Sequence, residues 1–193
     1  MKNSIMAIVI LITINNQINA QTKSNDFRNF NWRTPLSEVQ KNEKSNFVNE
    51  EKGDLLKYED QLGGSDCYVI YTFNDNNKLI SGNYVFTKKY SNSQLYLHDY
   101  AKFEKLLTEK YGKAKLTKDD WSENTTPTEK ENYGQAVSSG NLTLNTIWET
   151  ERSIIKITLF SIENSPTLQI HYTFKTLNEL EDKSELQKAL IKL

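Results

Sequence analysis

SQLYLHDYAKFEKLLTEKYG, residues Ser93–Gly112, is the stretch that decides the fold. Its apolar side chains recur every three or four positions, which is the period of an α-helix with one buried face. They are Tyr96, Tyr100, Phe103, Leu107 and Tyr111, and Leu106 widens the stripe. Ser93 is suited to cap the start of this helix, and Gly112 is suited to end it. We therefore expect a helix packed on a sheet; the alternative is an aromatic ligand-binding stripe.

Alternating apolar and polar residues predict strands before this helix. These strands are Leu55–Glu59, Cys67–Phe73 and Lys78–Thr87, with a turn at Asn74–Asn77 that makes the last two a hairpin. Gly82, within the third strand, indicates a bulge or the close approach of another group.

A short helix should precede these strands. Thr34 followed by Pro35 is typical of a helix start, and the helix should end near Ser45. Phe30 and Trp32 lie just before it and are expected to pack into the core, as are Phe103 and Tyr111 of the central helix.

A similar pattern follows the central helix. The predicted strands are Ala114–Trp121, Leu142–Trp148, Ile155–Leu159 and Leu168–Phe174. The sequence therefore predicts an α+β fold with two helix-plus-antiparallel-meander units, residues 30–92 and 93–175. The order of the elements, not residue identity, suggests that the units are tandem repeats. Residues 176–193 carry a patchy leucine stripe and predict a C-terminal helix.

The N-terminal residues resemble an export signal. Lys2 precedes an apolar run, Ser4–Ile14, that is too short to span a bilayer comfortably, and Ala20 is a suitable cleavage residue. We expect residues 1–20 to be a signal peptide and residues 21–29 to be a flexible leader. A retained membrane anchor is the alternative. The mature protein would be periplasmic or secreted, with no transmembrane span after cleavage.

Composition and the single cysteine narrow the class of protein. Aromatic residues make up 11% of the chain, which is enough for a real core, and a net charge of −1 argues against a nucleic-acid binder. Cys67 lies far from the signal, so it is not a lipoprotein acylation site, and it has no partner for an internal disulfide. Its place in an alternating strand favours a buried thiol over a reactive nucleophile.

The sequence offers no recognisable catalytic or metal-binding motif. His98 and His171 lie far apart along the chain, and neither has a nucleophile or a carboxylate at a suitable spacing. We expect His171 to be solvated on the outer face of a strand. We also expect no metal, no cofactor and no catalytic residue.

The motifs resemble a loose group of uncharacterised exported bacterial proteins. That group carries an F-x-W-x-[ST]-x-x-x-V motif and a K-Y-G-K-[AP] helix end followed by a tryptophan. Here these are Phe30-Asn31-Trp32 with Thr34 and Val39, spaced differently by one residue, and Lys110–Ala114 followed by Trp121. The group has no established activity. The helix-plus-meander arrangement also looks like the beta-lactamase inhibitor protein and small outer-membrane assembly lipoproteins, an analogy of shape alone.

The long polar stretch Ser122–Gly140 is the most promising functional segment. It is either an exposed insertion or contains a brief strand at Gln135–Val137, and loops on rigid scaffolds often carry function. Trp121 and Tyr133 are the expected partner-binding residues, with an inert insertion as the alternative. We expect an exported, non-catalytic binding or interaction protein for an unknown protein or envelope ligand. A secreted hydrolase with a cleft between the halves, and a secreted inhibitor or immunity-like protein, are the alternatives.

Overall fold

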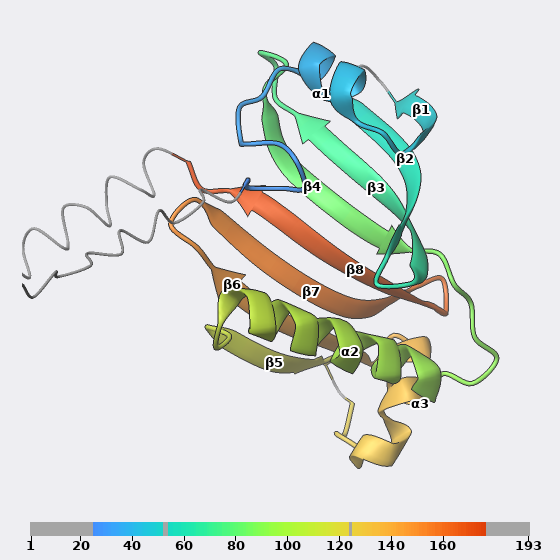
Figure 1. Ribbon diagram of the computed structural model, residues 1–193. Helices are drawn as coiled ribbons and strands as arrows, with labels where there is room; N and C mark the ends of the chain where they lie inside the picture. Colours follow the sequence, from blue (N-terminus) through green and yellow to red (C-terminus); the bar gives the residue numbers. More distant parts are fainter. Residues whose placement is uncertain (1–24, 52–53, 124, 177–193) are drawn as a thin grey trace, which may run out of the picture.

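The computed structural model describes residues 25–51, 54–123 and 125–176, and within them the fold is α+β (Figure 1). The helices are α1 (Leu36–Asn42), α2 (Gln94–Tyr111) and α3 (Tyr133–Ser138), with a 3₁₀ turn η1 (Lys130–Asn132). The strands are β1 (Asn46–Glu51), β2 (Leu55–Leu62), β3 (Ser65–Phe73), β4 (Leu79–Phe86), β5 (Leu116–Trp121), β6 (Leu142–Glu149), β7 (Ser153–Ile162) and β8 (Ser165–Phe174).

All described strands belong to one antiparallel sheet. Its order is β1-β2-β3-β4-β8-β7-β6-β5, so two four-stranded meanders join through their last strands. At this central seam Tyr84 of β4 pairs with Ile170 of β8. The two predicted meanders are therefore present, but they build one continuous sheet with a single hydrophobic core.

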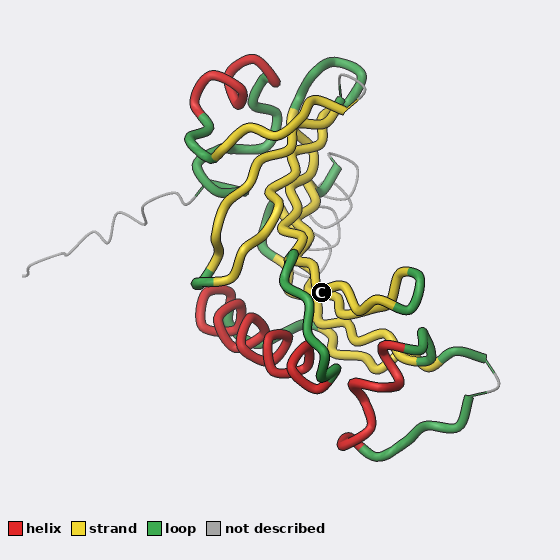
Figure 2. The backbone as a smooth tube through the Cα atoms, turned by 90° about the vertical axis from the view of Figure 1, so that its right-hand side faces the viewer, coloured by secondary structure: helices red, strands yellow, loops and turns green. Residues whose placement is uncertain are grey.

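The helices cover one face of this sheet, and Figure 2 shows α1 and α2 on the same side of it. The predicted buried stripe of α2 is confirmed for Tyr96, Tyr100, Phe103 and Leu107, and Tyr111 is partly buried. The prediction for Leu106 is wrong, because 45% of its side chain is exposed. Leu106 lies at the margin of the stripe, beside the β2–β3 turn at Gly63.

The sequence predicted the C-terminal end of α2 correctly but not the residue that caps its N-terminal end. Gly112 has φ 80° and its amide donates to the Thr108 carbonyl, so the predicted end is confirmed. The predicted cap is wrong, because Ser93 has helical backbone angles and makes no capping bond. The Asn92 side chain instead accepts a hydrogen bond of 3.0 Å from the Gln94 amide.

The N-terminal segment is part of the core. Phe27 is 1% exposed, and its ring lies about 5 Å from those of Tyr71, Tyr84 and Tyr172. A Cβ atom on Gly82 would lie 2.1 Å from the Phe27 ring, so Gly82 provides the predicted close approach. Phe27 is therefore packed against the sheet, within the stretch 21–29 for which a flexible leader was expected.

The other predicted core residues of the first half are buried as expected. Trp32 is 3% exposed and its indole donates a 2.8 Å hydrogen bond to Ser153 of the second half. Cys67 is buried in β3, as the alternation predicts, and burial raises the pKa of its thiol to about 11. Helix α1 begins at Leu36, one residue later than expected, and β1 was not anticipated.

The stretch Ser122–Gly140 contains η1 and α3, so the alternative of a brief strand at Gln135–Val137 is wrong. Val137 is 1% exposed and anchors α3 in the core. A Cβ atom on Gly134 would lie 2.7 Å from the backbone of Ser93, so only glycine allows α3 to approach the start of α2 this closely.

Two predicted segments cannot be compared with the structure. The signal peptide, residues 1–20, and the C-terminal helix, residues 176–193 except for Thr176, lie outside the described residues. Among the helices that are described, none combines the length and apolar character needed to cross a bilayer.

Candidate functional site

The fold brings Trp121 and Tyr133 together. Their ring centroids are 5.5 Å apart with planes at 79°, an edge-to-face contact. Trp121 ends β5 and pairs with the buried Leu142, so its side chain points to the helix-covered face of the sheet. The Tyr133 hydroxyl donates a 2.9 Å hydrogen bond to Asp119, which raises the pKa of this tyrosine.

A pocket of about 270 Å³ opens beside Trp121. The residues that line it are Trp121, Thr125, Thr128, Asn132, Gln135, Ala136, Ser139 and Asn141. Trp121 and Ala136 are apolar, and every other described lining residue carries a neutral hydroxyl or amide. Tyr133 is not part of the lining; it packs against Trp121 from the side.

Backbone hydrogen bonds hold the frame of this pocket. The Ser122 amide donates to the Asn141 carbonyl, and the Asn141 amide donates to the Ala136 carbonyl, both at 2.9 Å. Gly140, with φ 75°, makes the turn between α3 and β6 that allows the second bond. The Gln94 side chain donates to the Glu131 carbonyl and links η1 to α2. The segment expected to be an exposed insertion is therefore tied to the scaffold at both ends.

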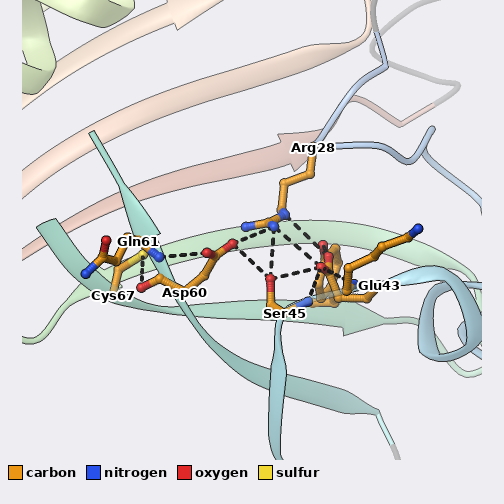
Figure 3. A network of polar contacts seen from close by, with 8 residues as sticks. Arg28, Glu43, Ser45, Asp60, Gln61 and Cys67 are labelled. Atoms are coloured by element: carbon orange, nitrogen blue, oxygen red, sulfur yellow. Dashed lines mark hydrogen bonds and ion pairs between the residues drawn. The ribbon is translucent and has the colours of Figure 1, made fainter. Parts of the chain in front are cut away.

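A second cluster of polar side chains surrounds Arg28 (Figure 3). Its guanidinium lies 2.6 Å from Asp60 and 3.3 Å from Glu43. The Ser45 hydroxyl lies 2.8 Å from Asp60 and 3.0 Å from Glu43, so its one proton is shared between the two carboxylates, and Tyr71 donates to Glu43. These residues come from the N-terminal segment, the α1–β1 connection, β2 and β3, so the cluster joins four parts of the first half.

The electrostatics of this cluster indicate a structural role. Burial would raise the pKa of Glu43, but hydrogen bonds from Tyr71 and Ser45 and the charge of Arg28 outweigh it and lower the pKa. Burial likewise opposes the lowering of the Asp60 pKa by the Gln61 amide and Arg28. Both carboxylates are thus kept ionised by hydrogen-bond donors and by Arg28, which are partners within the protein itself. Sequence analysis missed the cluster, since its members are isolated polar residues.

An acidic hollow of about 480 Å³ adjoins the cluster at Glu59, Asp60 and Asp66. Lys44 and neutral polar side chains complete its lining. Within the described ranges, no three His, Cys, Asp or Glu side chains are grouped so as to hold a metal ion.

The two histidines differ in their surroundings. His98 is exposed on α2, whereas His171 lies on the sheet face opposite the helices, with Nε2 3.2 Å from the Ser81 hydroxyl. His171 lies on the outer face of its strand, as predicted, and its side chain is partly buried there. Burial and the charge of Lys156 lower its pKa. Its direct cross-strand neighbours are Asn83 and Lys156, so neither supplies the carboxylate that a catalytic triad places behind the imidazole.

No protein-family model, no curated protein and no solved structure matches this chain, so the pocket and the polar clusters are the basis for any functional conclusion.

Proposed function

We propose that this is an exported, non-catalytic binding protein that holds its ligand in the Trp121 pocket. The observation that carries the proposal is the lining of the pocket, which combines a tryptophan ring with neutral hydroxyl and amide groups. Such groups bind and orient a ligand, but none of them is a base or an acid near neutral pH. The lining therefore favours recognition over chemistry.

The remaining parts of the proposal rest on the sequence. Residues 1–20 are proposed to be a cleaved signal, which would place the protein in the periplasm or outside the cell. The two helix-plus-meander units are proposed to be tandem repeats, since each begins with a helix and contributes four antiparallel strands, with η1 and α3 inserted between β5 and β6 of the second unit. The β4–β8 seam would then be the junction between the repeats.

The alternatives have less support. A hydrolase would need a complete nucleophile and base, and the best pair, Ser81 and His171, faces Lys156 and Asn83 across the neighbouring strands. Ser81 is also 8% exposed, which leaves little room for a substrate. An inhibitor or immunity-like role is supported only by the analogy of shape.

The proposal is tested by capture from the cell envelope of the producing organism. The immobilised protein, its Trp121→Ala variant and a Leu116→Ala control are incubated with envelope extract, and bound material is identified by mass spectrometry. Leu116 lies on the same strand, is 47% exposed and does not line the pocket. We expect material retained by wild type and Leu116→Ala but lost by Trp121→Ala.

The same bound set in all three samples would contradict the proposal. Because Trp121 is partly buried, its loss could also disturb the fold. Thr128→Glu serves as a second variant, since Thr128 is exposed and the change places a charge in the pocket. Retention of the full set by this variant would contradict the proposal as well.

A further inference from the structure

The chemistry of the Trp121 pocket also restricts the class of ligand, given the proposed function. Among the residues that the structure describes, its lining contains no Lys, Arg, His, Asp or Glu. A phosphate, carboxylate or ammonium group is bound best through a charged partner, which these side chains do not offer. The lining equally disfavours a lipid chain, because the exposed amides of Asn132, Gln135 and Asn141 would lose their hydrogen bonds to water without replacement.

A sugar ring satisfies both constraints. Its axial C–H groups form an apolar patch that stacks on an aromatic face, and its hydroxyls both donate and accept hydrogen bonds. Asn132, Gln135 and Asn141 carry amides that do the same. The hydroxyls of Thr125, Thr128 and Ser139 already hydrogen-bond within the chain, and their oxygens add acceptors. The volume of about 270 Å³ lies just below the range of pockets for drug-sized ligands, so it suits one ring rather than a chain.

The aromatic platform is held in place before any ligand arrives. Tyr133 contacts Trp121 edge to face, and its hydroxyl is fixed by Asp119. The loop frame is closed by the backbone bonds of Ser122 and Asn141. A preformed site of this kind lowers the ordering cost of binding a small ligand.

We infer that the Trp121 pocket binds a single neutral sugar ring, stacked on Trp121 and hydrogen-bonded by the surrounding amides and hydroxyls. The ring is either a free monosaccharide or the terminal unit of an envelope glycan, since both present the same chemistry.

Tryptophan fluorescence offers a direct test. Trp32 and Trp148 are 3% and 1% exposed, whereas Trp121 lines the pocket, so a sugar-induced change reports on Trp121. The purified protein is titrated with glucose, galactose, mannose and N-acetylglucosamine, with glucuronic acid as the charged comparison. We expect saturable binding of at least one neutral sugar, with a dissociation constant on the order of millimolar.

Variants separate stacking from general effects on the fold. Trp121→Ala and Thr128→Glu, examined by saturation-transfer NMR, should weaken binding about tenfold or more, and Leu116→Ala should not. Titration with the methyl glycoside and co-sedimentation with a polysaccharide ending in the same sugar distinguish the two sources. A free-sugar site requires the open anomeric hydroxyl and rejects both glycosides, whereas a site for a terminal unit accepts them.

The sugar titration and the envelope capture together distinguish the ligand assignment from the proposed binding function. Absence of binding by all neutral sugars, equal binding of glucuronic acid, or unchanged binding by both pocket variants would overturn the sugar assignment. If the envelope capture still depends on Trp121 in that case, the proposed binding function survives and only the ligand class is wrong. If the captured material is also unchanged by Trp121→Ala, both the sugar assignment and the proposed binding function are wrong.

Discussion

Replacement of Glu43 by alanine tests the cluster around Arg28 (Figure 3). The Glu43 side chain is 2% exposed. It accepts hydrogen bonds from the Lys44 amide at 2.7 Å and the Ser45 amide at 3.0 Å, and another from the Tyr71 hydroxyl. The substitution removes all of these acceptors and leaves Arg28 with Asp60 as its remaining ion-pair partner.

The expected loss of unfolding free energy follows from these contacts. Breaking a buried ion pair by removing one partner costs about 3–5 kcal/mol, because the other charge stays buried. Leaving the Tyr71 hydroxyl without its acceptor alone costs about 1–3 kcal/mol. Since Asp60 still pairs with Arg28, we expect Glu43→Ala to lose about 3–4 kcal/mol.

Urea unfolding followed by circular dichroism measures this loss. Glu109→Ala, an exposed change on α2, is the control and should shift the free energy by less than about 0.5 kcal/mol. The pKa of Glu43 is lowered in the folded state, so its contribution is present above the unfolded pKa of about 4.3 and is lost as pH falls through the folded value. A loss below about 1 kcal/mol at pH 7, or one that grows on acidification, would refute this account of the cluster.

Further substitutions and one thiol-labelling experiment test the packing. Gly82→Ala should lose at least about 2 kcal/mol in urea unfolding, because the new methyl group would overlap the Phe27 ring, and a neutral result would mean that this ring is not seated there. Phe103→Ala should cost about 3–5 kcal/mol, whereas Leu106→Ala on the same helix should change little; equal effects would contradict the assigned helix face. Val137→Ala should lower the melting temperature through a loss of about 2 kcal/mol, which an unanchored loop would not show. Cys67 should react with a thiol reagent at pH 8 only after denaturant is added, because it is buried and its pKa is about 11; rapid labelling of the native protein would place it at the surface.

The sequence predicted those elements whose periodicity reflects burial. Tyr96, Tyr100 and Phe103 of α2 alternate with polar residues because only one side of that helix meets the sheet. Strand β1 was not predicted because it lies at the edge of the sheet. Phe47 is 52% exposed there, and packing does not impose an alternation of apolar and polar residues. Helix α3 was missed because Gly134, which sequence rules treat as a helix breaker, is needed for contact with α2.

The candidate site was predictable only in part. Tyr133 was predicted as a site residue because it is an aromatic residue within a polar stretch, and Trp121 because it directly precedes that stretch. The structure places their rings in contact. The other lining residues are ordinary Thr, Asn, Gln and Ser side chains without a spacing that sets them apart. Arg28 was equally inconspicuous, because its partners Glu43 and Asp60 lie 15 and 32 residues away along the chain.

The helix that decides the fold also fixes the position of the pocket. Gly134 of α3 packs against the backbone at the start of α2. The Gln94 side chain of α2 donates a hydrogen bond to the carbonyl of Glu131 in η1. The buried stripe of α2 is meanwhile seated on the sheet through Tyr100, whose hydroxyl lies 2.8 Å from that of Thr146 on β6. Strand β6 pairs with β5, which carries Trp121. The two walls of the pocket, α3 and the end of β5, are therefore held at a fixed separation by one rigid helix, which is the condition for a binding site formed before its ligand arrives.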